Sequence, residues 1–270
     1  MTVTAAPTAQ QLFENMPVAR PNKIAQWWAL TGRLVRTAAS SGDLLIVVGA
    51  TFIFTIGYWL PLRFVMSFQG INFAQFVMPI IVLQTMSFTM MSNAQIAATE
   101  AMTGLNLRMQ SMPVGGFVPL AARMSGGFVR AIVAMISSIA FGYWIGFRFI
   151  AGPAQAVGFV LFAFAVGFVL AIGADALGSL SKSPEALSQA LSLPTLIFGM
   201  LSCGFVPEKG FPHWIRPFVR NQPVSQFSFA LRDMAGTGVT WHVLWVPLVW
   251  LGGMGIVFIP LAIWASTRRS

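Results

Sequence analysis

The chain has 270 residues, of which 56% are hydrophobic and only 9% are charged, and its mean hydropathy is +0.75. Water-soluble domains carry about 25% charged residues, so this composition excludes a soluble globular protein and predicts a polytopic membrane protein. The formal net charge of +9 might suggest a nucleic-acid partner. The basic residues instead lie between the apolar stretches, where their distribution indicates the orientation of the chain in the membrane.

The N-terminal region divides into two parts. Residues 1–21 are rich in Ala, Thr, Gln and Pro and are expected to form a flexible cytoplasmic tail; the first forty residues hold no apolar core of a cleavable signal peptide. Residues 22–40 are expected to form a basic amphipathic helix along the inner leaflet. A plain juxtamembrane anchor is the alternative. The apolar face of this helix comprises Ile24, Trp27, Trp28, Leu34 and Val35.

Six stretches are long enough to cross a hydrocarbon core of ~30 Å. Backbone groups in lipid must be satisfied within the segment, so the stretches are expected to be helices, and the alternation of a membrane barrel is absent. We therefore expect an all-α polytopic membrane protein whose six-helix domain covers residues 41–270. Arg63 is expected to end the first span, and Pro79 interrupts the second. The spans are 44–62, 71–98, 128–147, 154–180, 187–206 and 241–264.

The distribution of basic residues favours one orientation. With the N-terminus inside, ten of the 16 Lys and Arg residues fall on the cytoplasmic side and six fall outside. This excess supports a multi-pass plasma-membrane protein with both termini in the cytoplasm under the positive-inside rule.

The segment 99–127 is the only sizeable cytoplasmic loop between spans. It begins with Glu100 and continues through Arg108 to Pro113 and a Gly-Gly pair, a pattern typical of a short helix ended by proline and glycine. Met109, Met112 and Pro113 would present an apolar knob with polar flanks. Two interpretations are open, a simple connection and a docking surface.

The long external segment, 207–238, is unlike the rest of the chain. Its sequence FPHWIRPFVRNQPVSQFSFALRDM places apolar residues at helical spacing from Pro212 to Pro223, followed by a second amphipathic stretch. We expect two short helices in a hairpin, broken at Asn221–Pro223, that caps the last two spans at the outer leaflet with its arginines near phosphates. The residues expected to form this external hairpin site are Trp214, Arg216, Arg220, Asn221, Pro223 and Arg232.

The sequence holds no recognisable motif of an ATPase or a metal-dependent enzyme. A P-loop needs the spacing GxxxxGK[ST], which is absent, so the chain is not expected to hydrolyse ATP. His213 and His242 lack the HExxH or CxxC spacing of metal sites. Cys203 lies in an apolar run and is expected to be a small buried hydrophobe. We therefore expect no catalytic residue, metal or cofactor in this chain.

Asp175 supports a competing interpretation, a proton-coupled transporter, because intramembrane carboxylates are usually functional. Counted from the middle of 154–180 at ~1.5 Å per residue, it lies about 12 Å from the bilayer centre. There the carboxylate is expected to reach headgroups or water, which makes it a poor relay. A third class, a non-transporting membrane scaffold, would need no polar residues at mid-span.

Polar and flexible side chains in the second span are candidates for a substrate pathway. Methionine offers adaptable apolar surface for a bulky cargo. Interhelical hydrogen bonding is the alternative for the amide side chains, since buried Gln and Asn commonly bond across helices in bundles. The candidate pathway residues are Gln84, Met86, Met90, Asn93 and Gln95.

Together these features resemble the type-2 ABC export permeases, most closely the daunorubicin-resistance (Drr) type of actinobacteria. The resemblance rests on the amphipathic N-terminal helix, the six spans, the loop ending in SMPV, and a hairpin with Asn221-Gln222-Pro223 followed by Ala-Leu-Arg. It covers nearly the whole chain from about residue 27.

The resemblance implies a permease that pairs with a homologous partner or with itself on two P-loop subunits, which would bind ATP and Mg²⁺. Helix 22–38 would be the elbow helix. The expected cargo is a hydrophobic cell-envelope lipid, with amphiphilic drugs secondary. Ala101 departs from the family pattern, which often places arginine after the acid. The residues implied to couple to the ATPase are Glu100, Arg108, Met109, Met112 and Pro113.

Overall fold

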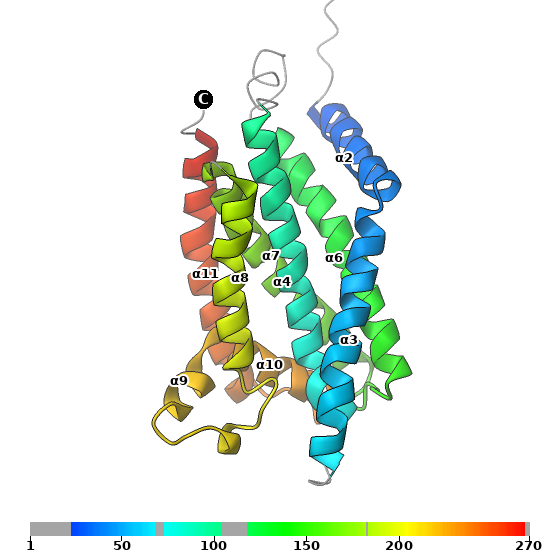
Figure 1. The fold of residues 1–270 in the computed structure, drawn as a ribbon, viewed down its shortest axis with the longest axis vertical. Helices are drawn as coiled ribbons and strands as arrows, with labels where there is room; N and C mark the ends of the chain where they lie inside the picture. Colours follow the sequence, from blue (N-terminus) through cyan, green and yellow to red (C-terminus); the bar gives the residue numbers. More distant parts are fainter. Residues whose placement is uncertain (1–22, 68–72, 104–117, 182, 268–270) are drawn as a thin grey trace, which may run out of the picture.

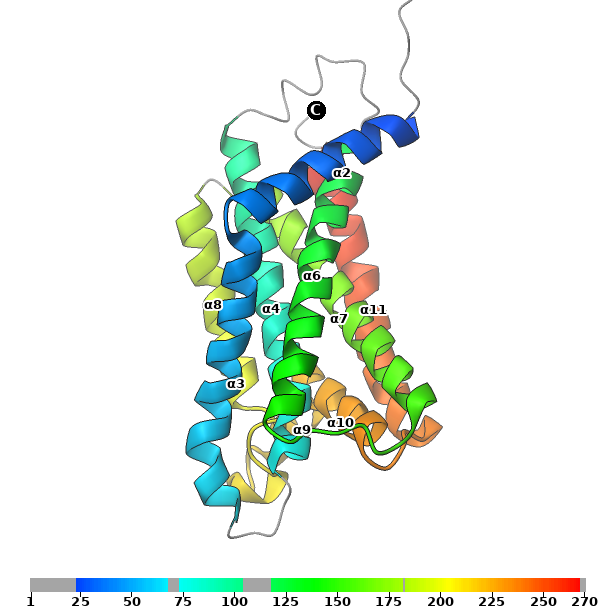
Figure 2. The same ribbon diagram turned by 90° about the vertical axis from the view of Figure 1, so that its right-hand side faces the viewer.

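The computed structural model describes residues 23–67, 73–103, 118–181 and 183–267, and every regular element in these ranges is helical. Long helices run side by side (Figures 1 and 2). Helix α2 lies across one end of the bundle, which we call the α2 end. The short helices α9 and α10 lie at the other, which we call the hairpin end. The helices are α2 (Lys23–Ser40), α3 (Asp43–Ser67), α4 (Phe73–Met102), α6 (Val118–Trp144), α7 (Pro153–Leu180), α8 (Pro184–Met200), η1 (Glu208–Gly210), α9 (Arg216–Asn221), α10 (Pro223–Ala235) and α11 (Trp241–Thr267).

Five of the described helices, α3, α4, α6, α7 and α11, are long and apolar enough to cross a membrane. They correspond to five of the six predicted spans. The remaining helix, α8, has 17 residues and ends at Met200 instead of 206. At ~1.5 Å per residue it is about 25 Å long, somewhat less than a hydrocarbon core of ~30 Å. The predicted span 187–206 therefore stays a prediction.

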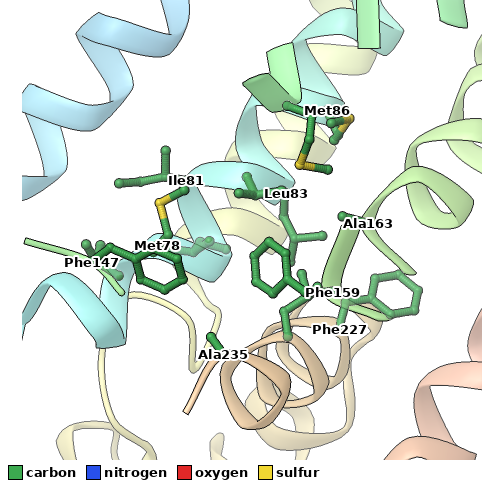
Figure 3. Packing of buried hydrophobic residues seen from close by; sticks show 14 of the residues in the cluster. Met78, Ile81, Leu83, Met86, Phe147, Phe159, Ala163, Phe227 and Ala235 are labelled. Carbon is green, nitrogen blue, oxygen red and sulfur yellow. The ribbon is translucent and has the colours of Figure 1, made fainter. Parts of the chain in front are cut away.

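Helix α4 is the centre of the bundle and packs against α3, α6, α7, α8 and α10. In its spanning part 67% of the residues are buried, against 17% in α3 and in α11, so α4 is surrounded by protein while α3 and α11 expose apolar side chains. Met78, Ile81 and Leu83 of α4 belong to the main core cluster together with Phe159 of α7 and Phe227 of α10 (Figure 3).

The predicted loop 99–127 is shorter than expected. Helix α4 continues to Met102, and α6 already begins at Val118, so the predicted third span at 128 starts ten residues late. Gly126 and Gly127, the last residues of the predicted loop, are helical residues of α6. A Cβ on Gly127 would lie 2.5 Å from Nδ2 of Asn93, so glycine lets α6 approach α4 closely at this point.

Helix α2 packs against α6, and Trp27 donates from Nε1 to the Ser125 hydroxyl at 3.1 Å. The single apolar face expected for this helix is divided, since Ile24 and Trp28 are 68% and 71% exposed. A turn at Gly42, with φ of +81°, joins α2 to α3 and suits glycine. Helix α3 runs on to Ser67, but its candidate membrane span stops at Pro61, which agrees with the expectation that Arg63 ends the first span.

The hairpin end follows the prediction in outline. Two short helices are separated at Gln222, and Pro223 begins α10, where a missing N–H costs nothing. The first helix does not begin at Pro212, however; α9 starts at Arg216, and Trp214 precedes it, 80% exposed. The hairpin contacts both of the last two predicted spans, as expected, because Gln222 bonds carbonyls at the end of α8 and α10 packs against α11; α10 also packs against α4 and α7, which the prediction did not include.

Candidate functional site

Three helices meet at the α2 end around one guanidinium. Arg123 of α6 donates from Nε to Oδ1 of Asp175 on α7 at 3.0 Å and from Nη2 to Oδ2 at 3.3 Å. Its Nη1 donates to Oε2 of Glu100, in the last turn of α4, at 3.4 Å. The three side chains are 8 to 15% exposed. Such enclosed, charge-assisted bonds hold α4, α6 and α7 in one arrangement.

A second arginine extends this cluster. Arg130 lies two helical turns beyond Arg123, donates from Nη1 to Oδ1 of Asn93 at 3.0 Å and pairs with Asp43 at 3.8 Å. Arg130 is 6% exposed, and it therefore joins α6 to α4 and to the start of α3. A small cavity of about 40 Å³ lies beside both arginines and Asp175.

The environment of Asp175 differs from the expectation. The residue is 5% exposed, and both carboxylate oxygens meet Arg123 instead of headgroups or water. The proton-relay interpretation receives no support from this geometry. Glu100 likewise pairs with Arg123, which supplies from α6 a positive partner that residue 101 does not provide.

The sequence interpretation did not single out Arg123 or Arg130. Both were counted only as topology signals. Their spacing of seven residues is a usable signal, because it places them on one face of a helix that must find partners for two charges inside a bundle. Of the five predicted coupling residues the structure describes only Glu100. The others, Arg108, Met109, Met112 and Pro113, lie outside the described residues.

The five predicted pathway residues do not all share one site, although Met86, Met90 and Asn93 together line the small cavity beside the two arginines. Asn93 accepts from Arg130, and Gln95 donates from Nε2 to the Ser188 hydroxyl on α8, so both amides have the helix-to-helix contacts that the alternative interpretation expects. Met86 is 1% exposed and packs against Gly167 of α7. Gln84 and Met90 line an apolar cleft, which is bounded by α4, α7, α8, α10 and α11.

At the hairpin end, Arg232 lies inside the protein and not among phosphates as predicted. Its Nη2 donates to the carbonyls of Phe76, Cys203 and Gly204 at 3.1, 3.4 and 3.5 Å. Its Cζ lies 3.9 Å from the centroid of the Phe76 ring. Burial lowers the pKa of Arg232 to about 10, so the side chain stays protonated at neutral pH.

The other two hairpin arginines differ from Arg232. Arg216 donates from Nε to the carbonyl of Phe211 at 2.7 Å and from Nη2 to that of Lys209 at 3.1 Å, which closes the loop before α9. Arg220 is exposed. Only Arg220 is therefore placed as the sequence prediction expected, on the surface of the hairpin.

Gln222, the middle residue of the Asn-x-Pro motif, is the hairpin residue that the sequence did not indicate. It is 3% exposed, and its Nε2 donates to the carbonyls of Phe198 and Leu201 at 3.2 and 2.5 Å. Phe198 lies in the last turn of α8 and Leu201 is its C-cap residue, and carbonyls at a helix end have no partner within the helix. Asn221, the predicted residue, donates only to the carbonyl of Pro217 within α9.

Within the described ranges no three His, Cys, Asp or Glu residues are grouped as a metal would require. Cys203 is 1% exposed, which confirms it as a small buried residue. His213 meets Arg216 at 3.2 Å through Nδ1. The features described at the two ends of the bundle are therefore ion pairs, helix caps and an apolar cleft.

The sequence is similar to that of known proteins. The family model described as "ABC-2 family transporter protein" matches residues 63–264. The chain is 41% identical over 240 residues to the doxorubicin resistance ABC transporter permease protein DrrB of Mycobacterium tuberculosis (strain ATCC 25618 / H37Rv), covering 84% of this chain and 83% of that protein. It is 27% identical to the daunorubicin resistance ABC transporter permease protein DrrB1 of Streptomyces coeruleorubidus, covering 70% and 67%.

A third relative is named DrrC instead of DrrB. The probable doxorubicin resistance ABC transporter permease protein DrrC of Mycobacterium tuberculosis (strain ATCC 25618 / H37Rv) is 29% identical over 61% of this chain and 59% of its own length. The helical fold, the spanning helices and these matches agree with the resemblance read from the sequence. The chain is an integral membrane protein that belongs to the ABC-2 transporter family.

Proposed function

We propose that the chain is a permease subunit of an ATP-driven exporter in the plasma membrane, with both termini in the cytoplasm. A dimer of P-loop subunits binds ATP and Mg²⁺, and a second permease, homologous or identical, completes the pathway. Relatives of 41% and 29% identity carry different subunit names, DrrB and DrrC, which favours a heterologous pair.

One structural observation supports the coupling part of this proposal. Arg123 joins the last turn of α4 to the start of α6, the two helices on either side of segment 104–117, and also reaches α7. A displacement of this end by a partner would therefore act on three spanning helices at once. Ion pairs with little exposure resist sliding, because separating them leaves a charge without its partner.

The cargo in this proposal is a hydrophobic cell-envelope lipid, with amphiphilic drugs as secondary cargo. The names of the relatives refer to doxorubicin and daunorubicin, which are amphiphilic drugs. The spanning helices expose extended apolar surface, and the described cleft is lined mainly by apolar side chains. Both features suit a cargo that stays within the membrane.

The subunit arrangement is tested by purification. The tagged chain, extracted in mild detergent or polymer, is expected to bring a stoichiometric P-loop ATPase whose activity rises when lipid is added. A folded, monodisperse chain that brings no ATPase under several mild conditions would contradict the proposal. It would favour the competing interpretation, a proton-coupled transporter that uses Asp175.

The coupling residues are tested by substitution in the assembled complex. Met112→Ala with Pro113→Ala is expected to uncouple ATP hydrolysis from transport while membrane insertion is unchanged. Met102→Ala, at the exposed end of α4, is the matched control and is expected to keep both activities. Unchanged transport in the double variant would refute the role of these residues.

A further inference from the structure

An apolar cleft of about 270 Å³ lies between α8 and α11. Helices α4 and α7 form its floor, and α10 closes it toward the hairpin end through Val224 and Phe227. Helices α8 and α11 form the two walls of the cleft. Helix α8 packs against α4, whereas α11 packs against α7 (Figure 1). An apolar cavity of about 150 Å³ is enough to bind benzene, and this cleft has room for a longer piece of hydrocarbon.

The position of the cleft decides which medium can fill it. Gln84 lies within a few residues of the middle of the span Phe73–Glu100, so at ~1.5 Å per residue it is about 4 Å from the bilayer centre. The surrounding medium at that depth is hydrocarbon. Water is disfavoured because a bound water needs two to four polar partners. The hydroxyls of Ser87 and Thr195 already donate to the carbonyls of their own helices.

Gln84 is the exception in this apolar lining. Its carboxamide has no hydrogen-bond partner among the residues that the structure describes, although the neighbouring amides Asn93 and Gln95 are both bonded. The Oε1 atom lies 3.4 Å from the point where a Cβ on Gly199 would stand, and glycine there leaves space beside the amide. A polar group at this depth without a partner is unfavourable.

We propose that the cleft between α8 and α11 binds an aliphatic lipid chain carrying an oxygen function, such as a hydroxyl or carbonyl, along its length, and that Gln84 hydrogen-bonds this oxygen. An ordinary phospholipid brings only methyl and methylene groups to the middle of the bilayer. Its ester groups stay near the interface, about 15 Å away. The inference rests on the proposed function, for which it names the chemical class of the cargo.

The test compares two competitors in the full-length chain, with any subunits that copurify, in lipid nanodiscs. A stearate with a photoactivatable group in mid-chain is cross-linked, and labelled peptides are located by mass spectrometry. Stearate and a hydroxystearate with its hydroxyl near the middle of the chain are the competitors. We expect labelling of the cleft-facing residues of α8 and α11, and hydroxystearate is expected to compete about fivefold better, the effect of one net hydrogen bond.

Three variants distinguish the contribution of the Gln84 amide from that of the cleft as a whole. Gln84→Leu is expected to keep the labelling and lose the preference for hydroxystearate. Thr195→Trp, which fills the cleft from α8, is expected to abolish labelling of its lining. Gln189→Leu is the matched control, because this amide is exposed on α8 and does not line the cleft. It is expected to keep both labelling and preference.

Equal competition by the two stearates in the unaltered chain would overturn the inference, as would a preference that survives in Gln84→Leu. Cross-links from cleft residues to a second permease chain would also overturn it, because they would show a protein occupant. If these results appear while the P-loop ATPase still copurifies, the inference fails and the proposed function stands. Specific labelling without any ATPase would support the site and contradict the proposed function.

Discussion

Arg123 and Asp175 share two hydrogen bonds, at 3.0 and 3.3 Å, between a guanidinium on α6 and a carboxylate on α7 that are 12% and 8% exposed. Glu100 on α4 approaches the same guanidinium at 3.4 Å. One positive charge therefore stands between two negative charges, and the three members of the cluster are not equivalent. Loss of the arginine leaves two enclosed carboxylates facing one another, whereas loss of Asp175 leaves a complete pair.

This asymmetry predicts an order of stability. Arg123→Met is expected to lower the free energy of unfolding by about 3–5 kcal/mol, the cost of leaving a buried charge unpaired. Asp175→Asn is expected to cost roughly 1–3 kcal/mol, because Glu100 still pairs with the arginine. Thermal unfolding of the purified variants measures both. Arg36→Met, at an exposed position of α2, is the control. Equal losses for Arg123→Met and Asp175→Asn would show that Glu100 does not share the arginine.

The cap on α8 gives a second prediction. Gln222→Ala removes the donor that serves the carbonyls of Phe198 and Leu201, and it is expected to destabilise the protein by roughly 1–3 kcal/mol. Hydrogen exchange at the last turn of α8 is expected to quicken at the same time. Asn221→Ala is the matched control, since that amide bonds only within α9. A protection pattern at α8 that is the same in both variants would contradict the capping role.

The sequence predicts the helices well because lipid allows few alternatives to a helix for a long apolar stretch. The start of α6 was missed, since the predicted loop ran to Gly127 whereas the helix begins at Val118. Gly127 lies against Asn93 of α4, a tertiary contact that the local sequence does not reveal. The break at Gln222 was found because proline fixes it, but the amide between the two motif residues has no local signature.

The partners of the helices were beyond the sequence for a different reason. Lipid-facing and protein-facing positions are both apolar, so hydropathy does not distinguish α4, at the centre, from α3, at the edge. The arginines show the same limit. Arg220 and Arg232 occur at similar places in an amphipathic pattern, yet one is exposed and the other is enclosed by backbone carbonyls that come from distant parts of the chain.

The enclosed guanidinium leads to a third prediction. Arg232→Lys keeps a positive charge but replaces a planar group with a compact ammonium that sits less well over the Phe76 ring. It is expected to cost about 1.5–3 kcal/mol, the usual value of hydrogen bonds to a charged group. With a pKa of about 10 the arginine does not titrate near neutrality, so its contribution in the unaltered chain is expected to be the same across the neutral range. Thermal unfolding at several pH values checks this, and Arg220→Lys is the exposed control; no loss would show that charge alone suffices.

Close packing of α4 on α7 gives the last prediction. A Cβ on Gly178 would lie 2.4 Å from the carbonyl oxygen of Ala94, a backbone atom that cannot move without shifting α4. Gly178→Ala is therefore expected to lower the free energy of unfolding by about 1–3 kcal/mol through overpacking. Gly158→Ala lies on the same helix, where the nearest atom to a Cβ is 3.9 Å away, and it is expected to be neutral or to stabilise the helix by up to about 1 kcal/mol. Unfolding of both variants, measured side by side, distinguishes contact from helix propensity, because propensity alone would make both alanines stabilising.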